Sequence, residues 1–276
     1  MAARFIIINN EIKDTHENLN LSSIYLKETF RLEEKIWFCN GKIPLYEENI
    51  FSLCEQAEII SYNIPEILNN KNEIRRLIQR IINKNKAFLS GLINVSIIFQ
   101  EKKSDLIISL IPSENNHFEL KNQSLLLSFS KCIKFSGNEF NCFRFYNSAF
   151  WKTVQFDASK SKVDGFIILN EKGGIVEYPE SNIYFIKDKV LCTPSLETGC
   201  YLDPIREKIL EAATILDLKI VETNKLNQDI ISDMDEAFIA GESIAMQKIM
   251  GIGNKRFTHR TTILINKKLN EILLEN

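Results

Sequence analysis

Residues 164–206 read DGFIILNEKGGIVEYPESNIYFIKDKVLCTPSLETGCYLDPIR, and this stretch decides the fold. It predicts a series of short strands separated by tight turns. The strands expected here are 165–169, 175–177, 182–187 and 190–193. Asp203 and Pro204 then predict the start of a helix, because aspartate can cap free backbone amides and proline at the first helical position loses no hydrogen bond. Short strands followed by a helix favour a mixed α/β domain.

Hydrophobic periodicity on either side of this stretch predicts further strands and helices. Before it we expect strands at 5–8, 24–30, 36–39, 91–100, 105–111 and 124–129, and helices at 46–60, 65–82 and 148–159. After it we expect a strand at 218–221, a short helix at 226–231 and a strand at 236–240. The sequence therefore predicts an α/β (α+β) protein with a smaller domain at 1–120, a larger one at 121–276, and a cleft between them.

Composition excludes several classes of function. The 276 residues carry a formal net charge of −2, so no basic field would recruit nucleic acid. The apolar runs are too short for a signal peptide or a membrane span. Six cysteines without CxxC spacing and three scattered histidines predict free thiols and no metal site. We expect a cytoplasmic protein, because free thiols are typical of a reducing compartment.

Six short motifs follow one another in order along the chain. They read ETFR at 28–31, NGK at 40–42 with LYEE at 45–48, DGFIILN at 164–170, EYPESNIYFIK at 177–187, TPSLETGC at 193–200 with Arg206, and DEAFI at 235–239. This order resembles the aminotransferase class IV family over residues 25–245. The sequence looks nearest to bacterial 4-amino-4-deoxychorismate lyase-like members and to branched-chain or D-amino-acid aminotransferases.

The resemblance implies a specific architecture and cofactor. Members have the two-domain fold type IV, are usually homodimers, and bind pyridoxal phosphate (PLP) between the domains. A lysine holds the PLP aldehyde as a Schiff base and later moves protons at the substrate carbon. That lysine opens a K-x-x-N/Y segment, some thirty residues before a glutamate that pairs with the pyridine nitrogen.

The lysine position of the family holds Arg144 in this chain. Glu177 matches the glutamate, and residues 144–147, RFYN, match the lysine segment. A guanidinium stays protonated at any accessible pH and cannot replace the amine. Lys152, the nearest lysine downstream, is eight residues off and falls within the predicted helix.

The positions that the resemblance assigns to the cofactor phosphate are also altered. Ser52 stands where the family has an arginine, which removes a strong contact to a dianion. The helix start that offers amides and a hydroxyl reads Asp203, Pro204 and Ile205, so a donor is lost and a negative charge is added. After the DEAFI strand, Glu242 and Ser243 replace small hydroxyl residues.

These changes predict a degenerate homologue without ordinary PLP Schiff-base catalysis. Its cleft is expected to contain Arg144, Tyr146, Glu177 and Arg206, and Arg144 to bind a small carboxylate or phosphate. The alternative is an active PLP-dependent aminotransferase or 4-amino-4-deoxychorismate lyase acting on an amino-acid-like substrate.

A third hypothesis is PLP-free chemistry at the same site. It would use Glu177 or Glu180 as a base and Cys142 or Cys200 as a nucleophile. The sequence shows no recognisable Cys/His or Ser/His/Asp set of catalytic residues that would support it.

Overall fold

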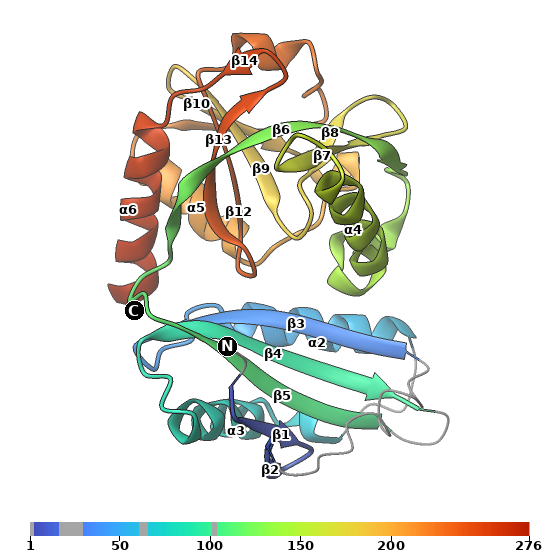
Figure 1. Cartoon of the computed structure of the whole chain (residues 1–276), viewed down its shortest axis with the longest axis vertical. Coiled ribbons are helices and arrows are strands. Elements are labelled where there is room, and N and C mark those ends of the chain that lie inside the picture. Colours follow the sequence, from blue (N-terminus) through green and yellow to red (C-terminus); the bar gives the residue numbers. More distant parts are fainter. Residues whose placement is uncertain (1–2, 17–29, 61–65, 101–103, 276) are drawn as a thin grey trace. The chain divides into compact units, whose positions relative to one another are not determined.

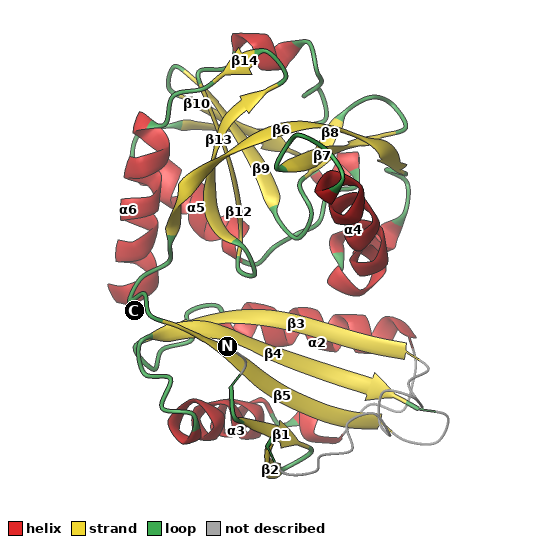
Figure 2. Ribbon diagram, viewed as in Figure 1, coloured by secondary structure: helices red, strands yellow, loops and turns green. Residues whose placement is uncertain are grey.

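The computed structural model describes residues 3–16, 30–60, 66–100 and 104–275 and divides the chain into two compact units. Unit 1 spans Met1–His117 and unit 2 spans Phe118–Asn276 (Figure 1). Each unit has its own sheet and its own helices (Figure 2). The α+β fold class predicted from the sequence is confirmed.

Unit 1 is built on a sheet with the order β2-β1-β5-β4-β3, in which all pairs are antiparallel. Its strands are β1 (Phe5–Ile8), β2 (Glu11–Asp14), β3 (Phe30–Cys39), β4 (Ser90–Phe99) and β5 (Ser104–Ser113). The prediction of two separate strands at 24–30 and 36–39 was wrong at residues 31–35. Residues 31–35 lie inside β3, because each pairs with a residue of β4 and every second side chain can face the solvent.

Two helices of unit 1 follow the predicted apolar spacing. The helix α2 (Tyr46–Ile60) begins soon after the Asn40-Gly41 turn, where both residues have positive φ. The predicted helix at 65–82 is divided into η1 (Glu66–Asn69) and α3 (Lys71–Lys84), because the Asn70 side chain accepts the amide of Glu73 and caps a new start. The predicted strand residues 24–29 lie outside the described residues.

Unit 2 contains a mixed sheet with the order β11-β10-β9-β12-β13-β6-β7-β8. Its strands are β6 (Leu120–Lys134), β7 (Gly165–Asn170), β8 (Ile175–Glu177), β9 (Asn182–Lys187), β10 (Val190–Pro194), β11 (Lys219–Thr223), β12 (Glu236–Gly241), β13 (Ala245–Ile252) and β14 (Lys255–Arg256). The buried residues of one face form a single cluster that includes Leu127, Ile167, Phe185 and Ile239. This core holds the ends of β6, β8 and β12 in place.

The α-helices of unit 2 accompany this sheet and are red in Figure 2. They are α4 (Arg144–Ser159), α5 (Ile205–Ile215) and α6 (Arg260–Glu275). The start of α5 after Asp203-Pro204 is confirmed, and α6 was not predicted. The expected start of α4 at residue 148 was four residues late, because the Asn147 side chain donates to the carbonyl of Phe143 inside the first turn. Within the described residues, no helix is both long and apolar enough to cross a membrane.

The strand β6 buries residues of both faces, and its pairing with β7 is irregular near its end. The pairing with β7 shifts register between Phe129 and Ile133. Before the shift Leu125 and Leu127 are buried, whereas after it Lys134 is buried and Ile133 is 46% exposed. The four-residue step in β6 lies opposite a two-residue step in β7, so the alternation of faces is kept. Lys134 pairs with Asn170 and lies on the same face as Ser128, which pairs with Phe166. This is the face opposite Leu125 and Leu127.

Candidate functional site

Glu177, at the end of β8, is the centre of a buried polar cluster in unit 2. Its side chain is 0% exposed. The Lys134 ammonium lies 3.0 Å from each of its two oxygens. The indole N–H of Trp151 donates at 2.7 Å and the amide of Tyr201 at 2.5 Å. The carboxylate therefore receives hydrogen bonds on both oxygens and has a cation in direct contact, as a buried charge requires.

Lys134 was not predicted as a site residue. Its ammonium also donates to the carbonyl of Asn141 at 3.3 Å, and the Asn147 side chain donates to that same carbonyl at 2.7 Å. Lys134 and the first turn of α4 are thus both hydrogen-bonded to the carbonyl of Asn141. Simple alternation along β6 gave no signal for a buried lysine, because Lys134 lies on the face opposite the apolar residues Leu125 and Leu127, and its partners Asn141 and Glu177 come from other segments.

Arg144 is the first residue of α4, and its side chain is only 4% exposed. Its guanidinium donates to the Glu180 carboxylate at 2.9 Å and to the Tyr201 hydroxyl at 3.3 Å. The guanidinium carbon also lies 5.7 Å from the ring centre of Trp151 and 5.4 Å from that of Tyr201. Arg144 is therefore a buried cation between two aromatic rings with a carboxylate partner.

Glu180 was considered only as a base in the sequence, yet it is the partner of Arg144. It has φ of 61° in the turn from Tyr178 to Ser181, a conformation unusual for a side chain of this size. Its side chain is 19% exposed, so the solvent reaches the ion pair from the Glu180 side. The hydroxyl of Ser243 lies 3.5 Å from the Glu180 carbonyl oxygen, which connects this turn to the end of β12.

Asp203 precedes α5 and is 2% exposed. Its Oδ1 accepts the amide of Ile205 at 3.1 Å. The amide of Glu242 lies 3.1 Å from Oδ1 and 3.2 Å from Oδ2 of the same carboxylate. We call the amides of Ile205 and Glu242 the amide pair. The predicted capping role of Asp203 is confirmed, and the amide from the β12–β13 turn is a second contact that the sequence did not predict.

Two predicted cleft residues lie in other surroundings. The Arg206 guanidinium donates to the Thr193 hydroxyl, the Pro194 carbonyl and the Glu222 carboxylate, at 3.1, 2.7 and 2.7 Å. Arg206 thus ties α5 to β10 and β11. Tyr146 is 44% exposed, and its hydroxyl accepts a hydrogen bond of 2.6 Å from Asn138. Neither side chain is hydrogen-bonded to Glu177.

Ser52 belongs to α2 in unit 1 and is described there by itself. Its hydroxyl donates to the Glu34 carboxylate at 3.0 Å, and the Gln56 amide donates to the same oxygen at 2.5 Å. Glu34 is 1% exposed. Where the resemblance expects a cation for a phosphate, this helix therefore presents a small donor to a buried carboxylate.

The two cysteines of the third hypothesis differ in environment. Cys200 is 1% exposed and burial raises the pKa of its thiol, so the thiol stays protonated at neutral pH. The Cys142 thiol donates to the carbonyl of Glu139 at 3.4 Å. All six cysteines are free. Among the described residues, no cluster of three or more His, Cys, Asp or Glu side chains could hold a metal ion.

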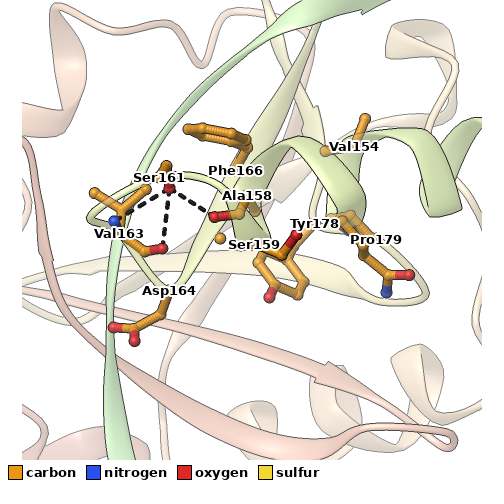
Figure 3. A pocket seen from close by; sticks show the side chains of 11 residues that line it. Val154, Ala158, Ser159, Ser161, Val163, Asp164, Phe166, Tyr178 and Pro179 are labelled. Carbon is orange, nitrogen blue, oxygen red and sulfur yellow. Dashed lines mark hydrogen bonds between the residues drawn. The ribbon is translucent and has the colours of Figure 1, made fainter.

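A separate pocket of about 270 Å³ lies beside the last turn of α4 (Figure 3). Tyr178 and Phe166 contribute to its wall, and the Ser161 hydroxyl bonds to backbone groups of its own loop. Burial and then the charge of Asp164 raise the pKa of Tyr178. No residue predicted for the site lines this pocket.

Residues 26–252 match the family model described as amino-transferase class IV. A protein of Rickettsia bellii, named a probable branched-chain-amino-acid aminotransferase, is 29% identical over 251 residues. That match covers 86% of this chain and 81% of the relative. This chain belongs to the amino-transferase class IV family.

Solved structures of the family share its fold. The branched-chain amino acid aminotransferase of Escherichia coli superposes with a TM-score of 0.84 at 19% identity, over 98% of this chain and 94% of its own. The branched-chain amino acid aminotransferase of Thermobaculum terrenum, solved in its PLP form, gives 0.84 at 16% identity over 99% and 94%. The fold is type IV, as predicted, and PLP is the cofactor of this family.

Within this class IV chain, the groups expected to meet the cofactor are all engaged internally. Glu177, at the position that pairs with the pyridine nitrogen, is bound by Lys134. Arg144, which the sequence resemblance placed at the lysine position, is paired with Glu180. The amide pair at the expected phosphate position donates to Asp203.

Proposed function

We propose that this protein is a branched-chain-aminotransferase-like member of class IV that works as a binding protein, without PLP attached to a lysine. The observation that supports this most strongly is Arg144 at the lysine position, buried and paired with Glu180. A guanidinium does not lose its proton, so it cannot form the covalent link or accept a proton from a substrate. The existing contacts of Glu177 also do not fit PLP, because Lys134 already lies beside both of its carboxylate oxygens.

The position of Lys134 supports the same proposal. In the family the glutamate meets the pyridine nitrogen and the lysine meets the aldehyde carbon, at opposite ends of one ring. The two side chains must then stand a ring's width apart. Lys134 instead touches both oxygens of Glu177, so it replaces the pyridinium as the cation beside this carboxylate.

The ligand that we propose is a small carboxylate bound by Arg144. A bidentate carboxylate is the natural partner of a guanidinium, and Arg144 already holds one carboxylate, that of Glu180. Because Glu180 is the more exposed partner, a ligand carboxylate would displace Glu180 and leave the arginine in place. The relatives named as branched-chain aminotransferases suggest a branched-chain amino acid or its 2-oxo acid. A homodimer and a cytoplasmic location stay predictions.

A second candidate function is an active PLP-dependent transaminase in which Lys134 replaces the usual lysine. One observation favours it: Lys134 is a lysine with an ammonium inside the candidate site, in reach of Glu177. It would require Lys134 to leave both Glu177 oxygens and point to the opposite end of the ring. The buried ion pair opposes this, because separating two buried charges costs several kcal/mol.

The test combines a PLP titration, followed by absorption, with a transaminase assay on leucine, isoleucine and valine. We expect no new near-visible band and no 2-oxo acid product. We also expect a branched-chain 2-oxo acid to stabilise the wild type against heat and not the Arg144→Gln variant. Arg256→Gln, which removes an exposed arginine, is the matched control and should keep the stabilisation. A PLP band that the Lys134→Met variant loses would establish the second candidate instead.

A further inference from the structure

A buried carboxylate of the chain itself occupies the anion-binding position at the start of α5. The first amides of a helix have no partner within the helix and attract an anion. At α5 the amide of Ile205 donates to Asp203. The residue between them is Pro204, which has no amide to offer.

A second element converges on the same carboxylate. The amide of Glu242 reaches both oxygens of Asp203, although it follows β12, 39 residues further along the chain. A Cβ on Gly241 would lie 3.0 Å from Asp203 Oδ2 and would collide with the Glu180 carbonyl. Only glycine therefore lets the β12–β13 turn approach Asp203 this closely.

The carboxylate is also fixed from behind. The amide of Asp203 donates to the side chain of Asn182 at 3.3 Å, and Asn182 donates in turn to the Tyr201 carbonyl at 2.5 Å. Asp203 is thus oriented by the loop before α5 and held by amides from two elements. Its burial, at 2% exposure, keeps competing water away.

We propose that Asp203 is a built-in anion that permanently occupies the amide pair and closes this position to any phosphate group. A phosphate would have to displace a buried carboxylate from the same donors and would meet the negative charges of Asp203 and Glu242. The ligand class of the site is therefore restricted to carboxylates without a phosphate. This inference rests on the proposed function, because it concerns what the PLP-free site accepts.

The test measures thermal unfolding of the wild type and of Asp203→Ala in chloride, formate or inorganic phosphate at equal ionic strength. The variant should be destabilised in chloride and restored by formate or phosphate, which fill the vacated amide pair. Phosphate should bind the variant at least tenfold more tightly than the wild type, a difference of about 1.4 kcal/mol. Asp235→Ala is the matched control, because it removes a half-exposed carboxylate that also accepts an amide, that of Asp188. It should show no rescue.

Two results would overturn the inference. The first is that the wild type binds phosphate as tightly as Asp203→Ala does. The second is that Asp203→Ala is no more stable in formate or phosphate than in chloride. If Asp203→Ala does not fold, the same thermal unfolding is measured on Asp203→Asn. This variant keeps the shape of the side chain and removes its charge. It should be less stable than the wild type and indifferent to phosphate, and equal stability would overturn the proposal. A PLP adduct in the wild type would contradict both the proposed function and the restriction to ligands without a phosphate. Weak phosphate binding by the wild type, with anion rescue intact in Asp203→Ala, would support the role of Asp203 even if transaminase activity contradicted the proposed function.

Discussion

At the scale of single residues, buried charges distinguish this chain most clearly. Lys134 and Glu177 are 4% and 0% exposed and form an ion pair at 3.0 Å. A buried pair gives little net stability over an apolar one, but breaking it leaves one charge without a counter-ion. The pair therefore makes Lys134 hard to move and occupies the position of a cation beside Glu177.

Replacing Lys134 with methionine should destabilise the protein by about 3–5 kcal/mol, because Glu177 keeps its charge in the interior. Urea denaturation measures this loss. The double variant Lys134→Met/Glu177→Gln should recover part of it. Lys187→Met, which breaks a half-exposed pair with Asp235 at 3.4 Å, is the control and should cost no more than about 1 kcal/mol. If Lys134→Met lost as little unfolding free energy as Lys187→Met, the Lys134–Glu177 pair would not be closed to solvent.

Glu171 predicts a pH dependence of stability. The hydroxyl and the amide of Ser136 hold the pKa of its carboxyl at about 2, against an ordinary value of 4.5. A lowered pKa in the folded state means that the contribution is complete above 4.5 and is lost as the pH falls toward 2. The melting temperature of Glu171→Gln should therefore lie below that of the wild type at pH 6 and converge with it between pH 4.5 and 2. A gap that stays constant with pH would show that the ionised carboxyl has no such role.

At the scale of elements, glycines mark where strands pass other groups closely. A Cβ on Gly91 in β4 would collide with the carbonyl of Ile111 and lie 2.8 Å from the Phe38 ring. Overpacking of this kind costs about 1–3 kcal/mol. Gly91→Ala should lower the free energy of unfolding by that amount, measured in urea. Gly137→Ala has open space around the added atom and should be neutral; equal effects would contradict the packing in unit 1.

Local chemistry predicted some elements and not others. Asp203 and Pro204 marked the start of α5 because capping depends on neighbours in the sequence. The burial of Lys134 depends on its partner Glu177, which is 43 residues away. The partner of Arg144 is likewise 36 residues away. Motif order indicated the family and the altered positions, but the contacts that fill the site are long-range and had no local signal.

At the scale of the whole molecule, the chain has the class IV fold, and we propose that its site differs from that of its relatives. The family match spans residues 26–252 and the structural likeness covers nearly the whole chain. Arg144, Lys134 and Asp203 all belong to unit 2, and each has a partner inside that unit. Folds often host different functions on one scaffold. Here we propose that the scaffold binds a carboxylate in place of the reaction of its relatives.

The measurement that tests this account most directly is the intact mass of the protein after incubation with PLP and reduction with borohydride. Reduction makes any lysine–PLP link permanent, so the mass reports attachment without requiring activity. We expect an unchanged mass for the wild type. We expect the same for Arg144→Lys, because Lys134 still occupies the Glu177 carboxylate in that variant. A mass increase of one reduced PLP, mapped to Lys134, would contradict it and establish a PLP enzyme with a relocated lysine.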